Sequence, residues 1–211
     1  MEEAKLPVRI FTKPVLSIVL VLLILLNAPA NADEEALIVV NDFHATLLQV
    51  MQQGVALDFT ARQHLLREAI DSSFDMQMIG NVVLNRHWRE LTDDQRAQFV
   101  TAFLDLSSAT YASRFDDFSD QVFEPLGITE MNGGRLMVRT EISGPNMGTV
   151  SLDYILHKPD TEWLIISAIA DGVNDLALKR AEYTAIMNNA GFDALISDLQ
   201  AQIANLVANY R

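Results

Sequence analysis

Four histidines are the residues best suited to hold a metal ion in this chain, which contains no cysteine. They are His44, His64, His87 and His157. His64 could share a helical face with Glu68, and His87 with Glu90. Two such side chains do not complete a zinc site, and the chain has no His-Glu-x-x-His stretch. We therefore predict structural or surface roles for the histidines, and no metal.

The carboxylates and glycines give no stronger indication of catalysis. Asp93-Asp94 and Asp116-Asp117 are adjacent pairs, and neighbouring residues on a helix point in different directions. The chain has no Gly-x-Ser-x-Gly elbow, no phosphate-binding loop and no Gly-x-Gly-x-x-Gly run. The absence of cysteine also excludes thiol catalysis and iron–sulfur clusters. The sequence thus predicts no catalytic residue and no cofactor.

The first 32 residues have the pattern of a cleavable secretory signal. Basic residues precede an almost unbroken apolar run at 15–26, and Ala-Asn-Ala at 30–32 is a small-x-small cleavage site. A run of this length is shorter than the roughly 20 residues that a membrane-spanning helix needs. We predict cleavage after Ala32 and a mature chain, residues 33–211, outside the cytoplasm. The alternative is an uncleaved anchor, which would make the protein a tethered relay.

The charge of the chain argues against nucleic acid as a partner. The whole chain has a formal net charge of −13, from 15 basic and 28 acidic residues. Residues 1–32 contain three of the basic and two of the acidic residues, so residues 33–211 carry −14. Such a surface repels phosphate backbones and anionic lipid headgroups. Any contact with lipid must therefore depend on apolar burial.

Hydrophobic periodicity divides residues 33–211 into three parts. Three- and four-residue steps up to 119 predict helices at 37–51, from Asp58, at 74–88 and from a capping box of Thr92 and Gln95. From 120 to 170 the period is two, with strands near 121–126, 136–142, 150–156 and 163–170. Helices return in 171–211. We predict one α+β domain: a curved antiparallel sheet of about four strands, wrapped by N- and C-terminal helices.

Large apolar side chains occupy both faces of the predicted sheet. Met137 and Ile155 stand at positions where simple alternation expects exposure. A sheet covered by helices can enclose an apolar cavity, which is a common form of small-ligand site. The alternative is that these residues only fill the core.

Short motifs extend over the whole of residues 33–211. Within 74–111 they are Phe74-Asp75, Leu84-Asn85-Arg86-His87-Trp88, Phe99 with Phe103, and Thr110-Tyr111. Further stretches are 138–142, 150–158, Trp163, Asp171-Gly172-Val173 and 191–195. Together they resemble the MlaC and toluene-tolerance auxiliary family of periplasmic lipid-binding proteins.

The resemblance implies a soluble periplasmic carrier. Such proteins shuttle phospholipid between an outer-membrane lipoprotein complex and an inner-membrane ABC transport complex. Their partly NTF2-like fold holds acyl chains in an apolar cavity and tolerates different headgroups. Two features depart from the family. Asn85 replaces a glycine, which puts close helix packing or a local bend at this position in question, and residues 172–183 are more similar to the hopanoid-associated HpnM branch. That branch implies a hopanoid-type lipid as cargo.

Thirteen apolar or aromatic residues are predicted to contact the lipid, although each also suits an ordinary core. They are Ile79, Val83, Phe99, Phe103, Leu106, Tyr111, Val138, Leu152, Tyr154, Trp163, Ile165, Val173 and Tyr183.

A second hypothesis is an enzyme on an NTF2-like scaffold, with Asp153 and Tyr111 or Tyr154 in an apolar pocket. Strand alternation argues against it, because Asp153 should point away from Tyr154. A third is a structural envelope protein or adaptor with a solid interior.

Overall fold

Two long helices open the part of the chain that the computed structural model describes, residues 32–210. α1 (Ala32–Gln53) ends where Gly54, with a φ of +43°, begins the 3-10 turn η1 (Gly54–Ala56). α2 (Phe59–Ser73) follows, and the Asp58 carboxylate accepts a hydrogen bond of 2.8 Å from the Ala61 N–H. The predicted interruption and cap are both confirmed. The predicted signal segment lies outside the described residues, except for Ala32.

The predicted helix at 74–88 is wrong in one respect, because Asn85 divides it. α3 (Met76–Leu84) and α4 (Arg86–Glu90) meet at this residue, whose φ is +51° and ψ −117°. This conformation ends the helical hydrogen-bond pattern and suits glycine better than asparagine. The local bend is therefore present, even though asparagine stands in place of glycine.

A long central helix, α5 (Asp93–Arg114), begins at the predicted capping box. The Thr92 hydroxyl accepts a hydrogen bond of 3.2 Å from the Gln95 N–H, and the Gln95 side chain accepts one of 3.0 Å from the Thr92 N–H. The two bonds satisfy N–H groups that the first turn of a helix leaves unpaired. This local prediction is confirmed in full.

Five strands form one antiparallel sheet in the order β1-β2-β3-β4-β5. They are β1 (Val122–Met131), β2 (Arg135–Gly144), β3 (Met147–His157), β4 (Leu164–Ala170) and β5 (Val173–Asn174). The fifth strand has two residues, so the expected four longer strands are all present. β1 continues past its predicted end, with a register shift between Pro125 and Gly127. The α+β class is confirmed.

One face of the sheet packs on the helices. Val138, Tyr154 and Leu156 on this inner face are buried, and the Phe43 ring of α1 lies 6.3 Å from the Tyr154 ring. On the other face Met137 and Ile155 are direct neighbours across β2 and β3, and both stay partly exposed. Their size is explained by cross-strand packing rather than by a covering layer.

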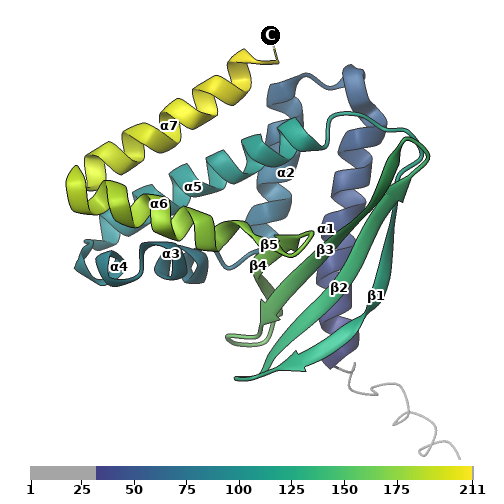
Figure 1. The fold of residues 1–211 in the computed structure, drawn as a ribbon, viewed down its shortest axis with the longest axis horizontal. Coiled ribbons are helices and arrows are strands. Elements are labelled where there is room, and N and C mark those ends of the chain that lie inside the picture. Colours follow the sequence, from purple (N-terminus) through teal and green to yellow (C-terminus); the bar gives the residue numbers. More distant parts are fainter. Residues whose placement is uncertain (1–31, 211) are drawn as a thin grey trace, which may run out of the picture. The chain divides into compact units, whose positions relative to one another are not determined.

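Two further helices complete the described chain. α6 (Asp175–Asn189) and α7 (Phe192–Ala208) run beside α5 and extend away from the sheet, while α1 lies along it (Figure 1). Tyr183 of α6 is fully buried, with its ring 6.1 Å from Phe99 and 6.2 Å from Phe103 of α5. Among the helices described, none combines the length and the apolar character needed to cross a membrane.

Candidate functional site

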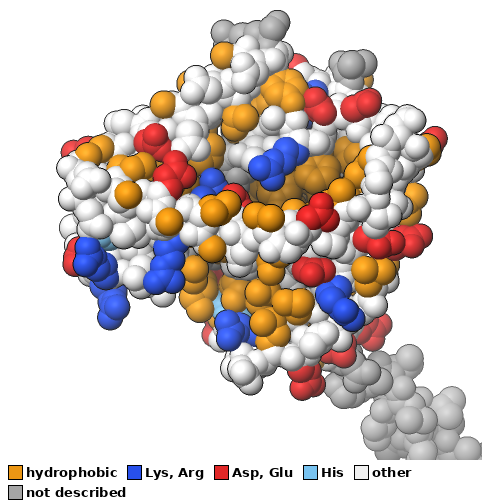
Figure 2. Space-filling model, in the orientation of Figure 1, with side chains coloured by type: hydrophobic (Ala, Val, Ile, Leu, Met, Phe, Trp, Pro, Cys, Tyr) orange, Lys and Arg blue, Asp and Glu red, His pale blue; other side chains and the backbone are white. Residues whose placement is uncertain are grey.

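A cavity of about 610 Å³ lies between the helices and the inner face of the sheet. Its walls come from the C-terminal half of α5, the starts of α3 and α6, and strands β2 to β4. Figure 2 shows a surface hollow near the ends of these elements, with a largely apolar floor and charged side chains near its edge. The apolar and aromatic lining residues are Met51, Ile70, Phe74, Met76, Ile79, Phe103, Leu106, Tyr111, Phe115, Ile142, Met147, Val150, Leu152, Tyr154, Ala168, Ala170, Val173 and Leu176.

Helical and strand periodicities place these side chains on the cavity. On α5, Phe103, Leu106 and Thr110 recur at three- and four-residue steps and line one side. On β3, Leu152 and Tyr154 alternate with residues of the outer face. Their partners on β4 are Ala170 and Ala168. Because these partners are so small, space remains between the sheet and the helices.

Asp75 fixes the start of α3 against the sheet. One carboxylate oxygen accepts a hydrogen bond of 2.8 Å from the Met78 N–H, and the other lies 2.9 Å from Nε2 of His157 at the end of β3. The Asp75 N–H donates to the carbonyl of Ile165 on β4 at 3.0 Å. These bonds hold Met76 and Ile79 in the cavity wall.

The inner wall is electrically neutral around Tyr154. The Tyr154 hydroxyl lies 3.0 Å from Nε2 of His44, whose ring stacks on Phe123 at 4.1 Å. Burial lowers the pKa of His44 to about 4 and raises the pKa of Tyr154 well above its usual value. Both groups are uncharged near pH 7, so this wall suits hydrocarbon better than an ion.

Seven of the thirteen predicted contact residues line the cavity. They are Ile79, Phe103, Leu106, Tyr111, Leu152, Tyr154 and Val173. They come from α3, α5, β3 and β5, which the fold brings together.

The other six residues lie in the core and not on the cavity. They are Val83, Phe99, Val138, Trp163, Ile165 and Tyr183. Phe99 and Tyr183 pack edge to face and join α5 to α6. Val138 and Ile165 are completely buried in the sheet. Apolar character alone cannot separate such core positions from cavity positions, because both are shielded from water.

Part of the cavity wall, and the charged residues of the cavity lining, were not predicted from the sequence. Ala168 and Ala170 were not predicted, because a small side chain gives no positive signal. The charged residues of the lining were also missed, since they come from distant segments. They are Arg114, Asp116, Asp117, Asp175 and Lys179.

Asp153, the suggested catalytic base, does not meet its tyrosine partners in the cavity. It stands opposite Arg139 on the outer face of the sheet, and it is not among the lining residues. Among residues 32–210 no group of three or more potential metal ligands is clustered. The described site is an apolar cavity with five charged side chains in its lining.

Comparisons with known proteins agree with this geometry. The sequence pattern of the MlaC protein family matches residues 41–201. The intermembrane phospholipid transport system binding protein MlaC of Haemophilus influenzae is 22% identical over 157 residues, which are 72% of this chain and 73% of the relative. The solved phospholipid-binding protein of Ralstonia solanacearum, in complex with a phospholipid, has a TM-score of 0.70 and 20% identity, and the match covers 83% of this chain and 99% of that one. Because the family pattern matches most of its length, the chain belongs to the MlaC family.

Proposed function

We propose that this protein is a soluble periplasmic carrier that moves phospholipid, or a hopanoid-type lipid, between outer- and inner-membrane complexes. The observation that carries the proposal is the apolar cavity of about 610 Å³. Small-molecule sites commonly have volumes of about 300–1,000 Å³. The names of the two similar proteins support a phospholipid as the cargo.

The energetics of acyl burial fit a carrier. Each buried methylene contributes roughly 0.8 kcal/mol, so a chain of about 15 methylenes gains about 12 kcal/mol. The same chain gains a similar amount in a bilayer, because both surroundings exclude water. Exchange between membrane and cavity is therefore nearly balanced, and the direction of transport must come from the partner complexes.

The proposed location follows from the first 32 residues and the family. Residues 1–32 would direct export and be removed, leaving one lipid-binding domain of residues 33–211 in the periplasm. The proposed partners are an inner-membrane ABC lipid-transport complex and an outer-membrane lipoprotein complex. Sequencing the N-terminus of the periplasmic protein should give Asp33 first, whereas Met1 would indicate the tethered alternative.

The two competing functions have less support. The enzyme hypothesis needs Asp153 beside a cavity tyrosine, and Asp153 lies on the outer face of the sheet. The adaptor hypothesis needs a solid interior, whereas the interior of this domain contains a cavity of about 610 Å³. We therefore propose no catalytic residue.

Transfer between separated vesicles tests the carrier function. Donor vesicles with a labelled phospholipid and unlabelled acceptor vesicles are placed on two sides of a filter that passes the protein but not vesicles. We expect label to reach the acceptors only when the protein is present. A transfer rate equal to that of the protein-free chamber would contradict the proposal.

A further inference from the structure

A second hollow, of about 470 Å³, lies on the surface between α3, α4 and α6 and shares no lining residue with the lipid cavity. Its lining residues are Asn81, Val82, Asn85, Arg89 and Arg180. All five are exposed and none is acidic, and we call this site the basic hollow. A site with this charge stands out in a chain of 28 acidic and 15 basic residues.

The two arginines of the basic hollow have no carboxylate partner. Within residues 32–210, neither guanidinium group forms an ion pair or a hydrogen bond, whereas Arg67 lies 2.6 Å from the Asp105 carboxylate. A third arginine, Arg86, borders the hollow and donates a hydrogen bond to the amide oxygen of Asn188. Figure 2 shows Lys and Arg side chains gathered at the lower left, in the region of α3, α4 and α6. These positive charges are therefore available to a ligand from outside the domain.

The backbone of Asn85 is strained at the same site. Its φ of +51° is unfavourable for a residue with a side chain, and its amide forms no side-chain hydrogen bond within residues 32–210. Residues held in such conformations cluster at functional sites. The strained residue thus presents an unpaired amide beside the unpaired guanidinium groups.

We propose that the basic hollow is the docking surface for a partner protein that presents clustered carboxylates. The inference rests on the proposed carrier function, because a carrier must be recognised by the complexes that load and unload it. Guanidinium groups form paired hydrogen bonds with carboxylates. Val82, which is 38% exposed, adds an apolar contact among these polar groups, and protein interfaces commonly combine the two.

The charge of the whole domain favours a protein over an anionic membrane as the occupant. Residues 33–211 carry a net charge of −14. At physiological salt the screening length is about 8 Å, so a small acidic patch on a protein interacts mainly with the hollow. An anionic bilayer is extended and also faces the surrounding acidic surface, which it repels. A local acidic patch is therefore the better match.

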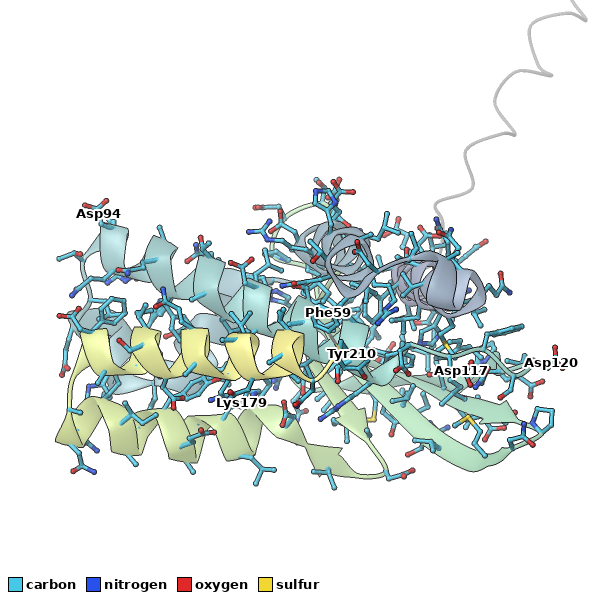
Figure 3. The ribbon with its side chains drawn as sticks, turned by 90° about the horizontal axis from the view of Figure 1, so that it is seen from above. Phe59, Asp94, Asp117, Asp120, Lys179 and Tyr210 are labelled. Carbon is cyan, nitrogen blue, oxygen red and sulfur yellow. The ribbon has the colours of Figure 1, made fainter. Side chains whose placement is uncertain are left out.

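The basic hollow adjoins the lipid cavity through two helices. On α3, Ile79 lines the cavity and Val82 lines the hollow, and three residues span about 4.5 Å along a helix. On α6, Lys179 lines the cavity and Arg180 the hollow, and Figure 3 shows Lys179 at the side of α6 that faces α7. A docked partner would therefore contact two helices that form part of the cavity wall.

Site-specific photo-crosslinking in cells tests the docking surface. A benzophenone amino acid replaces Val82 in the full chain, the cells are irradiated, and the crosslinked peptide is identified by mass spectrometry. We expect an adduct with another protein, at a segment in which Asp and Glu outnumber Lys and Arg. The double variant Arg89→Gln/Arg180→Gln should lower the adduct yield about five-fold, because two exposed ion pairs with the partner are lost.

Two controls match the position and the charge. Arg135→Gln/Arg139→Gln removes the same charge from two exposed positions of β2 and should keep the wild-type adduct yield. A benzophenone amino acid in place of Ile38, which is 50% exposed on α1, should not give this adduct.

The outcomes separate the docking surface from the carrier function. The absence of a protein adduct at position 82, an adduct with lipid, or an unchanged yield in the Arg89→Gln/Arg180→Gln variant would overturn the docking surface. Transfer between separated vesicles needs no partner, and neither arginine lines the cavity, so this variant should transfer lipid at the wild-type rate. Failure of the wild type to transfer lipid would instead overturn the proposed function.

Discussion

Replacing Ala168 with phenylalanine tests whether the apolar space binds the cargo. Ala168 lies on β4 opposite Tyr154 and lines the cavity. A phenyl ring at this position would occupy room otherwise open to the lipid. If the ring displaces about four methylenes at roughly 0.8 kcal/mol each, binding weakens by about 3 kcal/mol, or about 100-fold in Kd.

The fold should tolerate this substitution. Phenylalanine is favourable in strands, and its ring enters existing space instead of a packed core. We expect the free energy of unfolding to stay within about 1 kcal/mol of the wild-type value. A lower affinity would then report on the cavity and not on unfolding.

The assay is titration of lipid-free protein with a fluorescent fatty-acyl phospholipid, together with urea unfolding of each protein. Ala97→Phe is the matched control, because Ala97 is exposed on α5 and does not line the cavity. The control should bind like the wild type. If Ala168→Phe folds normally and binds lipid with unchanged affinity, the cargo does not occupy this cavity and the reasoning is refuted.

Three further predictions concern stability and pH, and urea unfolding measures each. Gly80→Ala should lower the free energy of unfolding by about 1–3 kcal/mol, because the added Cβ would lie 2.7 Å from the Trp88 ring; an unchanged value would mean that the ring moves freely. Asn85→Gly should raise it by about 0.5–1 kcal/mol, because the φ of +51° strains asparagine; a loss of stability would show that the side chain matters more than the backbone. His44 has its pKa lowered to about 4, so below pH 6.5 the unfolded chain binds a proton that the folded chain does not. Its stabilising contribution should therefore be complete above pH 6.5 and fall by about 3 kcal/mol towards pH 4, and His44→Gln should remove this part of the pH dependence.

Local signals in the sequence predicted most of the elements. The Thr92–Gln95 capping box and the Asp58 cap are complete within four residues, so the helices that follow them could be located. The break at Asn85 could not, because its backbone conformation depends on tertiary packing. The later half of β1 was missed because Pro125 and Gly127 disturb the alternation, while pairing with β2 holds the strand in place.

The cavity was harder to predict than the fold. Periodicity identified Leu106 and Leu152 as apolar and inward-facing, but the same property marks Val138, which is packed in the core. The empty space depends on Ala168, whose small size leaves no pattern in the sequence. Asp116 and Lys179 are far apart in the sequence, and only the folded chain brings both of them to the lining of the same cavity.

Native mass spectrometry of protein purified from the periplasm, without added lipid, tests the central claim most directly. The account predicts a complex whose mass exceeds that of the chain by one lipid, and collisional activation should release a phospholipid or a hopanoid. Ala168→Phe should lose most of this bound mass, and Ala97→Phe should keep it. Wild-type protein that carries no lipid under these conditions would contradict the claim that the cavity is a lipid-carrying site.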